Sequence, residues 1–199
     1  MYSAANEGDL ATVKFLLETN PGLNINWQSK EEKMSWTALH RACSNGHDGL
    51  VALLLAHPDI DVNQRDIHGN SPFRSACTKG RWTCVRLLLR DSRVMVNVPD
   101  VPGSTPLRGA VFHRHLLVVK WMIASGRRLD LGIPGDKRSD LIAIARTEGI
   151  TEAYSLLTGF RDTPDQVREE VKHELKISGQ YDVITFLRGG AGLNFVLCF

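Results

Sequence analysis

The sequence predicts an all-α fold, a solenoid of stacked helix pairs joined by short hairpin loops. The segment Thr37–Ala42 recurs as Ser71–Ala76 and again as Thr105–Ala110, 34 residues apart each time. A glycine follows the first two copies at the same distance, at Gly46 and Gly80. An apolar triplet follows each copy in register: Leu53–Leu55, Leu87–Leu89 and Trp121–Ile123. A fixed period of this length indicates structural repeats that stack on one another.

Each unit is predicted to form two short antiparallel helices followed by a hairpin. Ser71 with Pro72 supplies an N-cap and a proline at the first helical position. The small pair Ala42-Cys43 allows neighbouring helices to approach closely, and the glycine after it ends the helix in a left-handed conformation. In the third copy Arg114 stands where this glycine is expected. The segment Asp66–Gly69 then turns the chain back through a tight turn.

This pattern resembles the ankyrin repeat, whose signature is T-P-L-H-x-A, and the resemblance covers residues 37–138 in register. It implies a non-catalytic protein–protein interaction module, an adaptor, scaffold or regulatory subunit that binds a protein partner on its concave face. The expected repeat domain is 1–158, divided into 1–36, 37–70, 71–104, 105–138 and a degenerate 139–158.

The two ends of the array depart from the pattern. The connection from Asn26 to Thr37 is three residues longer than its later counterparts, so the first hairpin is expected to project. Residues 159–199 are expected to form a C-terminal helical cap or a degenerate sixth repeat. Thr163–Gln166 resembles a capping box and predicts a helix, with a stripe of Val167, Val171 and Leu175. This region is expected to cover the apolar end of the stack, with Leu193–Phe199 packed on the last helices.

Composition excludes several classes of function. The 24 Lys and Arg against 22 Asp and Glu give a net charge of +2, which provides no global attraction to nucleic acid or acidic membranes. No run approaches the ~18 apolar residues of a membrane span, and the N-terminus lacks signal-peptide character. We therefore expect a monomeric, intracellular protein, cytoplasmic or nuclear, with no membrane contact. The four cysteines show no C-x-x-C spacing, so reduced thiols are expected.

The sequence contains no motif that predicts catalysis or cofactor binding. The glycine-rich nucleotide motifs and the H-E-x-x-H zinc motif are absent from it. His113 and His115 form a His-x-His pair, but no further ligand stands near them, so we expect no metal. Cys43 and Cys77 occupy equivalent small-residue positions and are interpreted as buried hydrophobic residues. We expect no enzyme activity and no cofactor.

Basic residues concentrate in the middle of the chain. Residues 74–138 contain 13 Lys and Arg against 4 Asp and Glu. Arg86 and Lys120 share an outward position of the second helix, whereas Lys79 lies near the concave side, so the charges are divided between faces. This favours a protein partner with an acidic patch over nucleic acid. Electrostatic nucleic-acid binding, a solvated basic surface without a partner, and the targeting part of a larger multidomain protein stay open as alternatives.

The repeat register predicts the partner-binding residues, because hairpin tips and the ends of first helices share the concave side. They are Trp36, Ser44, Asn45, Ile67, His68, Asn70, Thr78, Lys79, Val101, Ser104, Phe112 and His113. Trp36 is emphasised because a tryptophan at a tip has no packing role to explain it, and tryptophan often dominates interface energetics. Trp121, in contrast, aligns with Leu53 and Leu87 and is expected in the core.

Asn63 is a candidate modification site. Its setting, with Leu55 eight residues before it and Asp61-Val62 immediately before it, resembles the ankyrin pattern that asparaginyl hydroxylases accept. Asn97 is expected to be a poorer substrate, because Met95 replaces the acidic residue. The stronger interpretation of this asparagine is structural, as a hydrogen-bonding residue of the turn that starts the hairpin. In the next repeat Asp130 answers this position, one residue early.

Overall fold

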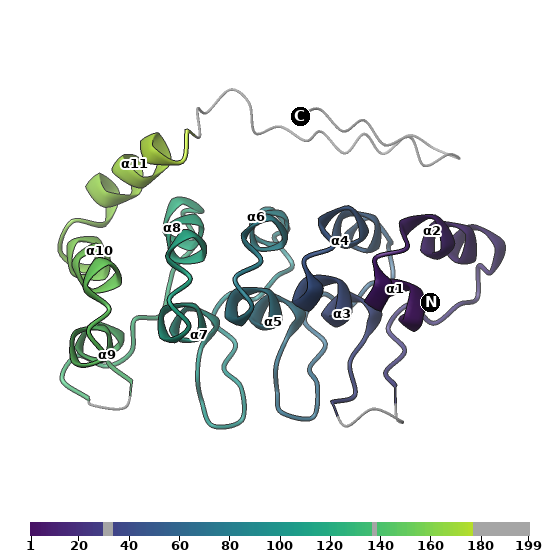
Figure 1. The fold of residues 1–199 in the computed structure, drawn as a ribbon, viewed down its shortest axis with the longest axis horizontal. Coiled ribbons are helices and arrows are strands. Elements are labelled where there is room, and N and C mark those ends of the chain that lie inside the picture. The colour runs from purple at the N-terminus through teal and green to yellow at the C-terminus, as the bar shows by residue number, and fades with distance from the viewer. Residues whose placement is uncertain (30–33, 137–138, 177–199) are drawn as a thin grey trace.

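The computed structural model describes residues 1–29, 34–136 and 139–176 (Figure 1). Within these ranges the regular structure consists of helices and no strand occurs. The helices are α1 (Tyr2–Glu7), α2 (Leu10–Thr19), α3 (Ala38–Asn45), α4 (Asp48–Leu55), α5 (Pro72–Thr78), α6 (Trp82–Arg90), α7 (Pro106–Phe112), α8 (Leu116–Ala124), α9 (Leu141–Thr147), α10 (Thr151–Asp162) and α11 (Pro164–Glu174).

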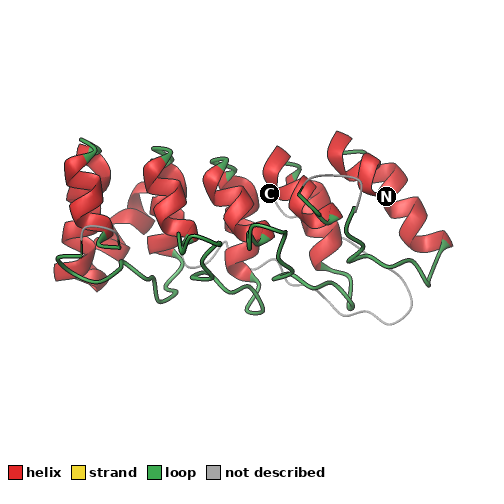
Figure 2. Cartoon of the chain, turned by 90° about the horizontal axis from the view of Figure 1, so that it is seen from below, coloured by secondary structure: helices red, strands yellow, loops and turns green. Residues whose placement is uncertain are grey.

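The helices stand in two parallel rows. In Figure 1, α1, α3, α5, α7 and α9 form one row, here called the inner helices, and α2, α4, α6, α8 and α10 form the outer row. Each inner helix contacts the next inner helix, and loops project from this row. Figure 2, viewed from the side of these loops, shows them following one another along the stack. The predicted all-α solenoid is confirmed, and none of the described helices is long and apolar enough to cross a bilayer.

The predicted caps start the inner helices. The side chains of Thr37, Ser71 and Thr105 each accept a hydrogen bond from the main-chain N–H three residues later. Pro72 and Pro106 occupy the first turn, where no backbone donor is required. These bonds satisfy N–H groups that would otherwise lack a partner at each helix start.

A left-handed residue ends the inner helices, as predicted. Gly46 and Gly80 have φ of 87° and 68°, and Gly149 takes the same position in the last pair with φ of 64°. Arg114 adopts φ of 60° at this position without being a glycine. The fold therefore imposes the conformation on Arg114, at a cost of about 1–2 kcal/mol.

Side chains from both rows form one continuous core. The small residues Ala42, Cys43, Ala76 and Cys77 are fully buried where neighbouring inner helices meet. Leucines of the outer helices, such as Leu54 and Leu88, fill the space between the rows. Burial of this continuous apolar surface supplies the main stabilisation of the stack.

Neighbouring repeats are also joined at the start of each outer helix. The residue that follows the left-handed position reaches back to a carbonyl near the end of the preceding inner helix. His47 bonds to the oxygen of Asn6, Arg81 to that of Ser44 and His115 to that of Thr78, at 3.0–3.1 Å. These side chains satisfy carbonyls that lack partners at helix ends.

The helix expected after residue 163 is present as α11, but the expected capping box is wrong. Thr163 makes no capping bond, because its N–H and its hydroxyl both donate to the carbonyl of Gly159 at the end of α10. The apolar stripe is confirmed, since Val167 and Val171 are buried and Leu175 is half-buried. This stripe packs α11 against α10 and back against α8.

Three sequence expectations fall wholly or partly outside the described residues. The extra residues of the first hairpin include 30–33. The proposed sixth repeat continues beyond residue 176, and the segment Leu193–Phe199 lies entirely beyond it. The expectation for Trp121 is met only in part, because this side chain is half-buried at the edge of the core and stacks on Trp82.

Candidate functional site

The hairpin tips form a rigid ladder along one side of the stack. Within the tip at residues 66–70, the Asp66 carboxylate accepts hydrogen bonds from the N–H groups of His68 and Asn70 at 2.9 and 2.8 Å. Adjacent tips are joined through the main chain, since the N–H of Val101 donates to the carbonyl of His68 at 2.8 Å. Although burial raises the pKa of Asp66, the hydrogen bonds from Asn70, Trp36 and His68 lower it overall. Asp66 is therefore an ionised acceptor that holds the tip in shape.

Trp36 has a structural role, so the argument that no packing role explains it is wrong. Its indole N–H donates to the Asp66 carboxylate at 2.9 Å, which links the first tip to the second. The Arg41 guanidinium lies 4.6 Å from the indole centroid, and the ring stacks on His40. Arg41 also donates to the Tyr2 hydroxyl. The sequence identified Asp66 only as a turn residue, and no repeating signal marked this one-off contact.

The remaining predicted residues differ widely in accessibility. Ile67, His68, Lys79, Val101, Phe112 and His113 are exposed, whereas Asn45, Asn70, Thr78 and Ser104 are half-buried. Ser44 is buried, at 5% exposure, because α3 is enclosed between α1 and α5, so its assignment as an exposed contact residue is wrong. The exposed fractions are 59% for Ile67, 68% for Val101 and 58% for Phe112. We call the six exposed residues the inner surface.

Ile67 and Val101 occupy the same register position in successive tips, and Phe112 and His113 end the next inner helix, α7. The Phe112 and His113 rings meet edge to face at 5.4 Å between centroids. Lys79 is the register equivalent of His113 on the preceding repeat. The inner surface therefore combines apolar side chains on the tips with Lys79, which is cationic, and His113 at the helix ends.

The His113 environment reports a positive potential on this side. Partial burial lowers the pKa of His113, and so do the neighbouring His115, Lys79 and Arg74. His115 bonds to the carbonyl of Thr78, which explains the second histidine of the His-x-His pair structurally. In the described part of the chain, no three His, Cys, Asp or Glu side chains are grouped to hold a metal ion.

Most of the basic side chains of the middle repeats contact the protein itself. Arg74 pairs with Asp100, and Lys120 pairs with Glu174 of α11. Others donate to main-chain carbonyls of neighbouring repeats: Arg81, Arg93, Arg114 and Arg127. These four guanidinium groups keep their charge, but they hold neighbouring repeats together, which leaves fewer of their donors to contact the phosphates of a nucleic acid directly.

A second ladder joins the repeats at the base of the hairpins. The Asn63 amide donates to the carbonyl of Arg93 at 2.8 Å and accepts from the N–H of Met95 at 2.9 Å. Asn97 bonds in the same way to the carbonyl of Arg128 and the N–H of Asp130. Both polar atoms of the Asn63 side chain are thus occupied in the folded chain.

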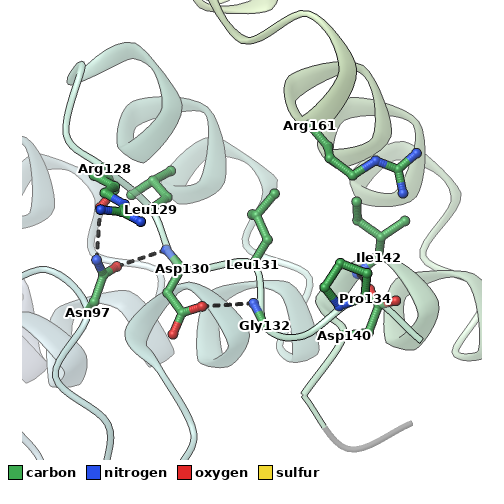
Figure 3. Close-up of a pocket in the computed structure, with 10 residues that line it drawn as sticks. All are labelled: Asn97, Arg128, Leu129, Asp130, Leu131, Gly132, Pro134, Asp140, Ile142 and Arg161. Atoms are coloured by element: carbon green, nitrogen blue, oxygen red, sulfur yellow. Dashed lines mark hydrogen bonds between the residues drawn. The ribbon is translucent and has the colours of Figure 1, made fainter. Parts of the chain in front are cut away.

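The last rung of this ladder borders a hollow of about 400 Å³ (Figure 3). The N–H of Asp130 donates to the Asn97 side chain, as the N–H of Met95 donates to the Asn63 side chain, so Asp130 is the equivalent of Met95. Gly132 therefore stands where the next asparagine would be, and the ladder ends there. The assignment of Asp130 to the asparagine position is therefore wrong by register. The carboxylate of Asp130 accepts from Gly132 N–H, and that of Asp140 accepts from the first turn of α9. These carboxylates stabilise the loop, and the inner surface is the better candidate for binding.

The described cysteines offer no reactive thiol. Cys43, Cys77 and Cys84 are buried and unpaired in disulfides. Burial raises the pKa of each thiol, to about 11 for Cys84. A thiol with a raised pKa is a poor nucleophile at neutral pH.

Comparison with known proteins agrees with this architecture. A family model described as ankyrin repeats in three copies matches residues 1–66, and one described as ankyrin repeats in many copies matches residues 53–110. Together they cover residues 1–110. The chain belongs to the ankyrin-repeat family. Ankyrin repeats are generally protein–protein interaction modules, and the family is typically non-catalytic.

Ankyrin-containing relatives match about a third of the chain. Rabankyrin-5 of Homo sapiens is 41% identical over 73 residues, which are 37% of this chain and 6% of that protein. Osteoclast-stimulating factor 1 of Xenopus laevis is 35% identical over 65 residues, which are 33% of this chain and 28% of that protein. The match thus spans less than a third of the length of either relative.

Proposed function

We propose that this chain is a non-catalytic interaction module that binds a protein partner on its inner surface. The observation that carries the proposal is the exposure of Ile67, Val101 and Phe112 on consecutive repeats. Large apolar side chains grouped at the surface characterise interaction sites. The ladder of tips holds Ile67 and Val101 in place before binding, and α7 holds Phe112, which reduces the conformational entropy lost on association. Adaptor, scaffold and regulatory roles are all consistent with such a surface.

The charge of the surface favours a partner with an acidic patch. Lys79 lies beside the apolar residues, and complementary charge accelerates and orients association. Nucleic-acid binding has weaker support, because many basic side chains of the middle repeats bond to carbonyls or carboxylates of the chain itself. We propose a monomer that works in the cytoplasm or the nucleus, without membrane contact. The targeting part of a larger protein is a further proposal, supported by the greater length of both relatives.

Affinity capture from a nuclease-treated lysate tests this proposal. The bait is the full chain, compared with a variant that carries Ile67→Ser, Val101→Ser and Phe112→Ser. The control is Phe15→Ser, which removes an equally exposed aromatic ring, at 63%, from the outer helix α2. We expect the captured proteins to be lost with the triple variant and retained with the control. Retention by the triple variant at unchanged helical ellipticity would refute the proposal.

A further inference from the structure

An aromatic patch lies on the opposite side of the stack, between α6 and α8. Trp82 of α6 stacks on Trp121 of α8, with 6.2 Å between centroids and 9° between planes. The Arg86 guanidinium lies 5.5 Å from the Trp121 ring centroid. Leu117, one helical turn before Trp121, shares this face and is 41% exposed, and Trp82 is 38% exposed. We call Trp82, Arg86, Leu117 and Trp121 the outer patch.

Two hydrogen-bond donors of the outer patch have no acceptor among the described residues. The indole Nε1 of Trp121 and the Nε of Arg86 are both shielded from solvent, and neither has a hydrogen-bond partner within residues 1–29, 34–136 and 139–176. Hidden donors without acceptors cost free energy, and native structures contain few of them. A strand or loop that packed here could meet both needs with its main-chain carbonyls. A segment that fits the outer patch therefore needs apolar side chains to pack on it and carbonyl oxygens to accept from its two donors.

The path of α11 leads toward this patch. Near its start, Arg168 donates to the carbonyl of Ile123 at the carboxyl end of α8. Near its end, Glu174 pairs with Lys120, closer to the middle of α8. In Figure 1, α11 lies over α8 on the outer side of the stack. The chain thus leaves α11 at residue 176 while moving along α8 toward Leu117.

The residues that follow have the chemistry to cover the patch. Residues 177–199 comprise 23 residues, of which 13 are apolar, with one Asp and one Arg. Adjacent packed helices are about 10 Å apart, and an extended chain advances about 3.3 Å per residue. A few residues after position 176 are therefore enough to reach from α8 to α6.

We propose that residues 177–199 of the same molecule are the occupant that docks on the outer patch. Because the segment is tethered beside its site, its effective concentration there is about millimolar. That tether favours it over a second copy of the chain. This inference does not depend on partner binding at the inner surface. The two faces would have different roles, because the inner surface stays open to a partner and the outer patch holds the chain's own residues.

Photo-crosslinking of the purified full chain tests the docking directly. p-Benzoylphenylalanine in place of Leu117 presents the probe on the outer patch, and the matched control places it at Phe112, on the inner surface of the same repeat. We expect irradiation of the first protein to join position 117 to a peptide within 177–199 in the same molecule, with unchanged mass. The control is expected to give no such product. Crosslinks between two molecules, or none from position 117, would overturn the proposal.

Variants within the segment separate docking from chance proximity. Phe186→Asp with Leu187→Asp removes apolar side chains and is expected to reduce the crosslink to the control level. The same variant is expected to increase acrylamide quenching of tryptophan emission, because Trp82 becomes accessible. Ser178→Asp adds charge without removing an apolar group and is expected to leave both readouts unchanged. An unaltered crosslink in the double variant, with intact helical ellipticity, would contradict docking through the apolar residues.

Discussion

Replacement of Gly80 by alanine tests how neighbouring repeats are coupled. Gly80 has φ of +68°, and a Cβ at this position would lie 2.6 Å from Nδ1 of His115. The imidazole would have to move and would lose its hydrogen bond to the carbonyl of Thr78. Gly149 provides a matched control, because it ends α9 at the equivalent position with φ of +64° and has no atom within 4 Å of its added Cβ.

The expected loss of stability follows from these two terms. A non-glycine residue in the left-handed region costs about 1–2 kcal/mol, and this cost applies to both Gly80→Ala and Gly149→Ala. Loss of the His115 hydrogen bond adds about 1 kcal/mol to Gly80→Ala alone. The predicted losses are therefore about 2–3 kcal/mol for Gly80→Ala and about 1–2 kcal/mol for the control.

Urea unfolding followed by helical ellipticity measures this difference. For a denaturant dependence of about 2 kcal/mol per molar urea, the extra loss lowers the midpoint of Gly80→Ala by about 0.5 M relative to Gly149→Ala. Equal midpoints for the two variants would show that the His115 link contributes nothing. Coupling of these neighbouring repeats through His115 would then be excluded.

Three further outcomes are expected. Asn63→Ala removes two inter-repeat hydrogen bonds and is expected to lower the free energy of unfolding by about 2 kcal/mol, and an unchanged urea midpoint would contradict the ladder. Asn63 is proposed as a hydroxylation site, so mass spectrometry after co-expression with an asparaginyl hydroxylase should show one added oxygen there, and an unmodified peptide would dispose of the idea. Burial lowers the pKa of His40 below its ordinary value of 6.5, and the smaller effects of the Asn70 carbonyl, Asp66 and Asp61 oppose this shift. The imidazole of the unfolded chain therefore binds a proton more readily than that of the folded chain. As a result, the free energy of unfolding should fall as the pH drops through about 6.5. His40→Gln should show a smaller fall between pH 7 and 5 in the same urea assay, and an identical slope would contradict it.

The sequence predicted those parts of the fold that recur. The caps at Ser71 and Thr105 and the left-handed ends at Gly46 and Gly80 follow from local chemistry repeated at a fixed period. Arg114 could also be assigned to the left-handed position, because register outweighs the intrinsic preference of a single residue. Each of these features depends on interactions within one repeat or on a contact made identically in several repeats.

Contacts that occur once in the array left no such signal. Trp36 reaches Asp66 of the next tip, whereas its register equivalents Asn70 and Ser104 do not repeat that bond, so its structural role could not be derived from period. Ser44 was assigned from register to an accessible helix end, but enclosure between two neighbouring helices is a property of the stack. Thr163 has the residue type of a cap, yet the direct passage from α10 into α11 occupies its polar atoms. One-off tertiary contacts decide these positions.

Amide hydrogen exchange of the partner complex locates the surface on which the protein partner binds. The full chain is compared with and without a captured partner. If the partner binds on the inner surface, exchange becomes slower at the tips, residues 66–70 and 100–104, and at the ends of α5 and α7. Protection confined to the outer helices α4, α6 and α8, with the tips unchanged, would contradict it.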